Sequence, residues 1–286
     1  MCKGVSPMPM VNSVTKMTDR IYRITELGSI HRYLVLGNEK ALLIDTGYGF
    51  EDIRPMIREI TSLPLLVANT HGHSDHCFGN YYFAEAYLNP KDLPGLLAGY
   101  TREAKEKIIE YRIRKNPWFK DVLDQDAYFA QNLNHVTHLP LVENDVLDLG
   151  GVTLRAIEVP GHSVGSVALY SPELRSLFGG DSVNSHPIWY VGSFDQTLPL
   201  SVFLQSLRRL QGMNLDFDAI YPGHGNSPIG PEVLDQLIGC ILDLNQRDEG
   251  DEPIENSGMV GRQHRFENVC IIYSPEHLKA LRDSLR

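Results

Sequence analysis

The residues with the clearest capacity for chemistry lie at positions 71 to 76, which read His-Gly-His-Ser-Asp-His. Imidazole nitrogens and carboxylate oxygens are ligands that suit zinc, iron or manganese. Residues two apart on an extended backbone point to the same side, so His71 and His73 can bind one ion together. Asp75 repeats that spacing, whereas His76 points elsewhere and can reach a second ion. The hexapeptide therefore predicts a metal site with ligands for more than one ion.

Three more polar side chains follow apolar, strand-like runs and have glycine beside them: His162, Asp181 and His224. Glycine permits turns and close backbone approach, and strand ends that meet at one edge are where α/β folds build their sites. Taken alone, a histidine in a glycine turn is more often a solvated or capping residue than a ligand. With the hexapeptide upstream, we expect all three residues to be metal ligands.

The charge of the chain argues against nucleic acid as a partner. The formal net charge is −10, whereas nucleic-acid binders usually carry a basic patch. The basic clusters at 105–107 and 112–115 are interleaved with Glu or apolar residues, a pattern typical of a solvated helix face. We therefore expect a small-molecule substrate and no nucleic acid, and the sequence is compatible with a homo-oligomer.

The chain shows no membrane or secretory signal. No apolar stretch approaches the roughly 18 residues needed to span a bilayer, and residues 1–17 lack the apolar core of a signal peptide. These features predict a cytoplasmic protein that does not bind membranes. The four cysteines form no C-x-x-C pair and no disulfide framework. Cys77 adjoins the hexapeptide, and we interpret it as a small packing group, with metal ligation or a redox role as the alternative.

Hydrophobic periodicity predicts an α/β chain that forms a single domain over residues 1–286. We expect strands at 20–25, 31–36, 41–44, 63–69, 146–149, 152–159, 167–170, 177–180, 219–221 and 269–273, the segments at 146–149 and 152–159 forming a hairpin. We expect helices at 50–60, 101–115, 122–133, 200–210, 231–244 and 275–285. A polar stretch at 245–267 precedes the last strand and helix, so residues from about 246 to 286 form a C-terminal strand-helix extension.

A helical insertion is expected at about 81–136, and its neighbourhood is rich in aromatic residues. The interval from Phe78 to Phe129 holds eleven of the 25 aromatic residues in the chain. One interpretation is that these side chains pack the helices onto the core. The other is that they form an apolar lid over the metal site, because small-molecule pockets are commonly lined by aromatic side chains.

Taken together, these motifs resemble those of the metallo-β-lactamase superfamily. The matching segments are, in order, Leu43-Ile44-Asp45-Thr46-Gly47, the cluster at 71–76, Pro160-Gly161-His162-Ser163-x-Gly165-Ser166, Gly180-Asp181 and Pro222-Gly223-His224. The resemblance implies an α/β (α+β) fold. This fold is a four-layer αββα sandwich of two mixed β-sheets, with metals at one edge and the helical insertion over the active site.

The resemblance also implies how the ligands divide between two metals. One metal takes His71, His73 and His162, the other takes Asp75, His76 and His224, and Asp181 bridges them. Asp45 would orient a ligand or the metal-bound water. Independently, six terminal ligands and one bridging carboxylate are too many for a single tetrahedral ion. We therefore expect two divalent ions, zinc first, although iron and manganese accept the same ligands.

Two such ions imply hydrolytic chemistry. Ions about 3.5–4 Å apart can share a hydroxide, because metal binding lowers the pKa of water toward 7. That hydroxide would attack a carbonyl or phosphoryl centre, with one ion stabilising the oxyanion and the other the leaving oxygen or sulfur. Asp75 is a candidate to pass a proton to the leaving group.

Position 181 narrows the branch of the superfamily. The commonest zinc β-lactamases would place Cys there, so Asp181 disfavours an antibiotic substrate and resembles thioesterases of the glyoxalase II kind and lactonases. Glyoxalase II relatives recognise glutathione with basic residues after the bridging Asp. Here no Lys or Arg lies between Asp181 and Arg208, so the match to a glutathione thioesterase is poor. By analogy with lactonases, Tyr190 is a candidate to contact a substrate carbonyl, with simple packing as the alternative. His186 is expected either to hydrogen-bond a ligand or to be an ordinary surface histidine.

We therefore expect a dinuclear metal-dependent hydrolase that cleaves a small ester, thioester or lactone through a metal-bridging hydroxide. An apolar portion of the substrate would lie under the aromatic segment. Two alternatives stay open: a small-molecule phosphodiesterase, and a mononuclear iron oxidoreductase that resembles persulfide dioxygenases. A non-catalytic metal-binding scaffold is the weakest interpretation, because every expected ligand is present.

Overall fold

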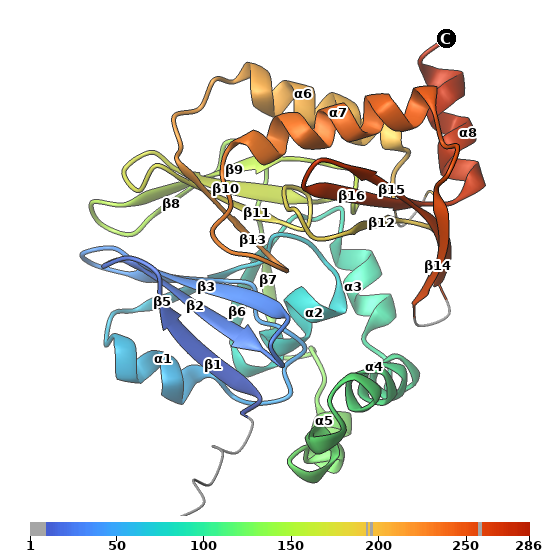
Figure 1. Cartoon of the computed structure of the whole chain (residues 1–286). Coiled ribbons are helices and arrows are strands. Elements are labelled where there is room, and N and C mark those ends of the chain that lie inside the picture. Colours follow the sequence, from blue (N-terminus) through green and yellow to red (C-terminus); the bar gives the residue numbers. More distant parts are fainter. Residues whose placement is uncertain (1–9, 193, 195–196, 257–258) are drawn as a thin grey trace, which may run out of the picture.

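Two layers of β-structure lie face to face between two layers of helices in the computed structural model of the chain (Figure 1). The structure describes residues 10–192, 194, 197–256 and 259–286. This arrangement confirms the expected α/β (α+β) sandwich of mixed sheets. No helix in these ranges is both long enough and apolar enough to cross a bilayer.

The first layer is a seven-stranded sheet in which strands follow one another in chain order. Neighbours are antiparallel from β1 to β4 and parallel from β4 to β7. The strands are β1 (Asn12–Lys16), β2 (Ile21–Glu26), β3 (Ile30–Leu36), β4 (Ala41–Ile44), β5 (Leu65–Ala68), β6 (Glu85–Leu88) and β7 (Thr137–Pro140). The carboxyl ends of the parallel strands meet at one edge, and this edge carries the hexapeptide.

The second layer consists of two hydrogen-bonded sheets, where we expected one. The larger has the order β13-β11-β10-β9-β8 and the smaller the order β12-β16-β15-β14. Their strands are β8 (Val146–Asp148), β9 (Thr153–Glu158), β10 (Val167–Ser171), β11 (Ser176–Gly180), β12 (Ile188–Tyr190), β13 (Ala219–Pro222), β14 (Glu252–Asn256), β15 (Met259–Phe266) and β16 (Val269–Tyr273). The expected hairpin at 146–159 is confirmed by the antiparallel pairing of β8 with β9.

The outer helices cover the sheets through apolar residues three and four apart, which share one face of a helix. In α6 (Leu200–Gly212) the buried positions include Phe203, Leu207 and Leu210. α6, α7 (Glu232–Gln246) and α8 (Pro275–Ser284) share one core with both sheets of the second layer. On the other side, α1 (Arg54–Ile60) shares a core with β4, β5 and the residues just after the hexapeptide, Cys77 and Phe78. A third core, which includes Val35, Leu42 and Phe178, fills the space between the β-layers.

The segment at 81–136 differs in part from the expected helical insertion. Its first part forms β6, a strand of the first sheet that pairs with β5 and β7. The helical part begins after it and comprises α3 (Leu93–Gly99), α4 (Arg102–Lys115), the 3-10 turn η2 (Pro117–Asp121) and α5 (Gln125–Ala130). β6 is only four residues long and closely follows an aromatic run, so its strand signal is too short to separate from a buried helical segment.

The aromatic side chains of this segment pack a small core of their own. Phe119 and Tyr128 are buried and lie against Phe50, at ring-centroid distances of 4.7 and 5.0 Å. For these residues the packing interpretation holds.

The C-terminal extension contains two strands that the polar composition hid. Residues within 245–267 form β14 and β15, which pair with each other in an antiparallel hairpin. β14 lies at the edge of its sheet and most of its side chains are half-buried or exposed. Alternation of apolar and polar residues is weak on such an edge, so the sequence reads as a loop.

Candidate metal centre

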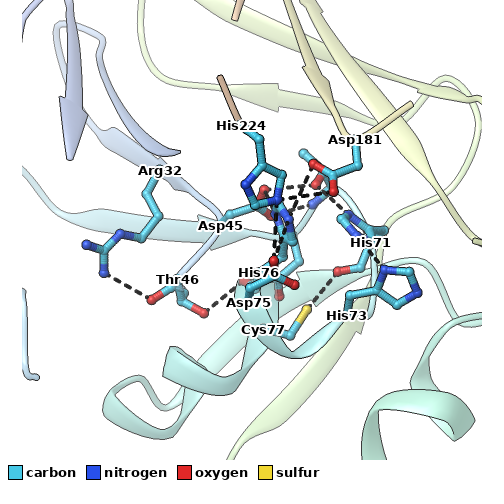
Figure 2. Close-up of polar contacts among 12 residues, drawn as sticks. Arg32, Asp45, Thr46, His71, His73, Asp75, His76, Cys77, Asp181 and His224 are labelled. Atoms are coloured by element: carbon cyan, nitrogen blue, oxygen red, sulfur yellow. Dashed lines mark hydrogen bonds and ion pairs between the residues drawn. The ribbon is translucent and has the colours of Figure 1, made fainter. Parts of the chain in front are cut away.

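Each expected ligand lies just beyond the end of a strand, and the ligands labelled in Figure 2 converge at one edge of the sandwich. His71 and His73 follow β5, and the short helix α2 (Ser74–Cys77) carries Asp75 and His76. The other three ligands follow strands of the second layer: His162 after β9, Asp181 after β11 and His224 after β13. The sandwich thus brings together side chains from positions 71 to 224.

The ligand atoms form three overlapping groups, and within each group they all lie within 4.8 Å of one another. The groups are His71, His73 and His162; Asp75, His76 and His224; and His71, His76 and Asp181. The first two match the two ligand sets that the sequence implied.

Asp181 lies between the two sets. Its Oδ2 is 3.6 Å from His162 Nε2 and 3.2 Å from His224 Nε2, and its Oδ1 is 3.4 Å from His76 Nε2. This carboxylate therefore faces a member of each set, as a bridging ligand would.

The donor set fits divalent cations. His76 Nε2, both ring nitrogens of His162 and Asp181 Oδ1 are buried, and none has a hydrogen-bond partner among the described residues. Buried polar atoms are normally paired, so convergent unpaired nitrogens and oxygens indicate a group that fills the space between them. Imidazole and carboxylate donors are those that zinc, iron and manganese prefer.

Electrostatics divide the ligand histidines into two kinds. Burial lowers the pKa of His71 well below its usual range and that of His162 to about 3, so both rings are neutral at pH 7. Burial also opposes protonation of His76 and His224, but nearby carboxylates outweigh it. Asp181, Asp45 and Asp75 raise the pKa of His76 well above its usual range, and Asp181 and Asp75 raise that of His224 to about 10. In the metal-free chain, two protonated imidazoles therefore separate the carboxylates.

Asp45 orients one ligand directly. Its Oδ2 lies 2.7 Å from His76 Nδ1 and 2.8 Å from the Thr70 hydroxyl, and its Oδ1 accepts a hydrogen bond from Thr70 N. A carboxylate on Nδ1 fixes the ring and leaves Nε2 facing Asp181 and Asp75. Asp45 has φ +62°, an uncommon conformation for a non-glycine residue, and this tight turn aims its side chain at the ligand.

The backbone of α2 is held by a network that the sequence did not indicate. The His76 carbonyl accepts hydrogen bonds from Asn69 Nδ2, Thr46 N and Thr46 Oγ1, and Asn80 joins Asn69 to Thr46. Cys77 is fully buried and its thiol lies 2.8 Å from the His71 carbonyl oxygen, to which it can donate (Figure 2). This position favours the packing interpretation of Cys77.

Below the Asp45 turn, a buried ion pair supports the same loop. Arg32 and Glu26 are fully buried and their charged groups lie 3.8 Å apart. Glu26 accepts a hydrogen bond from Tyr48 N, and Arg32 donates to the Thr46 carbonyl (Figure 2). The loop that carries Asp45 is therefore anchored on both sides.

Tyr190 is not brought to the ligands. Its side chain is fully buried in the core under α6, where its ring stacks on Phe203 at a centroid distance of 5.3 Å. The hydroxyl has no hydrogen-bond partner among the described residues. Alternation along β12 turns this side chain into the core, so the structure favours packing over a catalytic role.

Two histidines lie beside His224. His186 is exposed, with its ring centroid 5.5 Å from that of His224. His31 is buried with its Nε2 2.7 Å from the Gly225 carbonyl oxygen, and burial lowers its pKa to about 4. His31 therefore fixes the loop after His224, while the exposed His186 lies beside the His224 ring.

The helical segment also reaches the site, through residues that we had assigned to a solvated face. Arg112 and Lys105 are buried on α4, which corrects that expectation. Arg112 donates hydrogen bonds to the Ser29 hydroxyl (2.9 Å) and the Tyr48 hydroxyl (3.2 Å). The Ser29 carbonyl oxygen lies 2.9 Å from His224 Nδ1. α4 is thus connected to a ligand through one intervening residue.

The sequence was compared with protein families and with individual proteins of known name. The family model described as "Metallo-beta-lactamase superfamily" matches residues 26–224. The chain is 29% identical over 252 residues to the acyl-coenzyme A thioesterase MBLAC2 of Gallus gallus, covering 82% of this chain and 85% of that one. It is 27% identical over 249 residues to the atrochrysone carboxyl ACP thioesterase nsrC of Aspergillus novofumigatus, covering 82% and 63%.

Among solved structures, a metallo-beta-lactamase from Pontibacter korlensis superposes with a TM-score of 0.55 and 20% identity, covering 80% of this chain and 97% of that one. DIM-1 metallo-beta-lactamase gives a TM-score of 0.57 at 16% identity, covering 80% and 96%. At such low identity the two structures support the fold alone.

Proposed function

Because the chain belongs to the metallo-β-lactamase superfamily, we propose that it is a dinuclear metal-dependent hydrolase of small thioesters, with esters and lactones as related substrates. The observation that carries this proposal is the convergence of seven ligand side chains into two complete sets with Asp181 between them. The thioesterase names of two relatives favour a thioester within that class.

The geometry supports the following ligand roles. His71, His73 and His162 would hold one ion, Asp75, His76 and His224 the other, and Asp181 would contact both. When bound, such a pair of ions supplies a hydroxide at neutral pH and a Lewis acid for the carbonyl oxygen.

The protein's own residues prepare this chemistry. Asp45 keeps the Nδ1 side of His76 occupied, so that Nε2 is the atom presented to an ion. Neighbouring His76 and His224 depress the pKa of Asp75, although burial opposes that shift, so its carboxylate is ionised at neutral pH. We assign to Asp75 the transfer of a proton from the attacking water to the departing thiolate.

The alternatives are less well supported. A mononuclear oxidoreductase needs only one of the two ligand sets, yet both are complete here. A phosphodiester substrate has less support, because the relatives with thioesterase names point to an acyl substrate.

A substrate panel tests the proposal. Purified chain, loaded with zinc and separately with iron or manganese, is assayed on acyl thioesters of increasing chain length, lactones, aryl esters and bis(p-nitrophenyl) phosphate. We expect thioester cleavage, followed as released thiol, to exceed phosphodiester cleavage. We also expect thioester cleavage to fall at least about 100-fold in His162→Ala. Loss of a residue that only hydrogen-bonds to a metal ligand already costs about 10–100-fold, and His162 is itself an expected ligand.

The matched control is His135→Ala, which removes an exposed histidine that contacts the Tyr81 carbonyl. This variant should retain wild-type activity. Thioester cleavage that survives in His162→Ala, or phosphodiester turnover above thioester turnover, would contradict the proposal.

A further inference from the structure

The Asp92 carboxylate lies between the two loops that carry the first ligand set. It immediately precedes α3 and is only 6% exposed. Its Oδ2 accepts hydrogen bonds from Gly72 N (2.8 Å) and the Ser163 hydroxyl (2.6 Å), and its Oδ1 accepts one from Gly165 N (2.7 Å). Gly72 separates His71 from His73, and Ser163 follows His162. One carboxylate therefore joins the backbone segments of all three ligands.

Both backbone donors are glycines for a steric reason. A Cβ at Gly72 would lie 2.9 Å from Asp92 Cβ, and a Cβ at Gly165 would lie 2.9 Å from the Asp92 carboxyl carbon. At separations this short, one of the two segments would have to move. The absence of a side chain at these two positions is what lets the loops approach the carboxylate.

Helix capping does not explain Asp92. An aspartate at the start of a helix commonly accepts a hydrogen bond from an amide of the first turn, but Asp92 makes no such bond to α3. Nor does any Lys or Arg in the described ranges form an ion pair with it. A buried carboxylate is costly unless hydrogen bonds satisfy it. Here all the satisfying donors come from the two ligand loops.

The second ligand set has separate supports. Asp45 holds His76, and the Ser29 carbonyl faces His224 Nδ1. None of the three hydrogen bonds to Asp92 involves these elements. The two ion sites are therefore positioned by different parts of the fold, and this separation makes the role of Asp92 testable.

We propose that Asp92 is a positioning residue that holds the His71–His73 loop against the His162 loop and so sets the geometry of one ion site. This inference rests on the proposed function for the presence of the ion. Asp92 itself is not a ligand, because its oxygens are engaged by Gly72, Ser163 and Gly165.

Asp92→Asn is the direct test. The Asn side chain has an NH₂ donor in place of one carboxylate oxygen. In either orientation this NH₂ group faces the N–H of Gly72 or of Gly165, so one of the two backbone hydrogen bonds is lost. Ion affinity is measured by competition with a chelating indicator in two backgrounds. His224→Ala leaves the first ligand set complete, and His162→Ala leaves the second.

In the His224→Ala background we expect Asp92→Asn to weaken ion binding about 10- to 100-fold, the usual effect of removing an outer partner. In the His162→Ala background we expect a change of no more than about twofold, because that set does not depend on Asp92. Ser163→Ala removes one of the three hydrogen bonds and should give a smaller loss in the first background only. Equal losses in both backgrounds, or none in the first, would overturn the proposal.

The matched control is Glu158→Gln. Glu158 accepts hydrogen bonds from Asn89 and Lys91, close to Asp92, but contacts neither ligand loop. It should leave both affinities unchanged, and a loss equal to that of Asp92→Asn would show a general loosening of this region instead.

Amide hydrogen exchange of the metal-free chain separates this inference from the proposed function. We expect faster exchange at Gly72 and Gly165 in Asp92→Asn and no change at Thr70 N, which donates to Asp45. A wild-type chain that binds no divalent ion would overturn the proposed function. Unchanged exchange at both glycines would overturn the role of Asp92 by itself.

Discussion

Metal binding to the second ligand set should displace two protons, and its affinity should rise steeply with pH. In the metal-free chain, the pKa of His224 is raised to about 10 and that of His76 well above its usual range. Both rings are therefore protonated at pH 7.5, and a ligand nitrogen must lose its proton to bind an ion. Asp75 contributes no proton, because its pKa is lowered and it is already ionised.

The magnitude follows from linkage. Each displaced proton makes apparent affinity rise about tenfold per pH unit below the pKa of the group. Two protons give about 100-fold per unit between pH 7 and 9, which is below the value of about 10 for His224. The first ligand set behaves differently, because the pKa values of His71 and His162 are lowered and neither ring carries a proton to displace.

Titration calorimetry in buffers of different ionisation enthalpy measures the protons released. His162→Ala reports on the second set and His224→Ala on the first. A proton lost by a bound water would add to both, so the difference between the variants isolates the imidazole protons. Equal release in the two variants, or an affinity for the second set that does not change between pH 7 and 9, would refute the electrostatic argument.

Three further predictions concern single side chains. Asp45→Asn weakens the hydrogen bond that orients His76, so it should lower ion affinity or thioester turnover about 10- to 100-fold. Calorimetry measures the affinity, and the thiol-release assay measures the turnover. Arg112→Met should destabilise the chain by about 3–6 kcal/mol in urea unfolding, because two charged hydrogen bonds of about 1.5–3 kcal/mol each are lost, while the exposed Lys115→Met should change stability little. Tyr190→Phe should keep full turnover and leave stability equal or slightly higher, since the buried hydroxyl has no partner in the described ranges; a tenfold fall in kcat would restore Tyr190 as a catalytic candidate.

The sequence alone was sufficient to predict which side chains converge at the metal centre. The hexapeptide and the glycine turns at His162 and His224 are local signals, and each follows a strand whose apolar run is easy to recognise. The sandwich then converts strand ends that are far apart in the chain into neighbours at one edge. The structure brings all seven expected ligands together, although their binding of ions stays a prediction.

The resemblance implied the supporting role of Asp45, but the role of Asp92 could not be predicted, because it comes from contacts between distant segments. Asp92 accepts hydrogen bonds from Gly72, Ser163 and Gly165, which are separated from it by 20, 71 and 73 positions in the sequence. Lys105 and Arg112 carry charge and look solvated, yet with Ile109 they lie four and three residues apart on one buried stripe of α4. That spacing is the signal that could have found them. For Tyr190 the sequence gives too little information, because closeness in sequence to Asp181 does not fix which way a strand residue points.

The helical segment is better described as a fixed wall than as a lid that opens freely. Arg112 joins it to Ser29 and Tyr48, and Phe119 and Tyr128 are buried against Phe50. Full exposure of two such aromatic side chains costs about 3–6 kcal/mol at 1.5–3 kcal/mol each, before any hydrogen bond is counted. That cost corresponds to an open population of about one in 10² to one in 10⁴. Because the wall is tied to the residue that faces His224, a substrate that displaces it would also disturb the second ligand set.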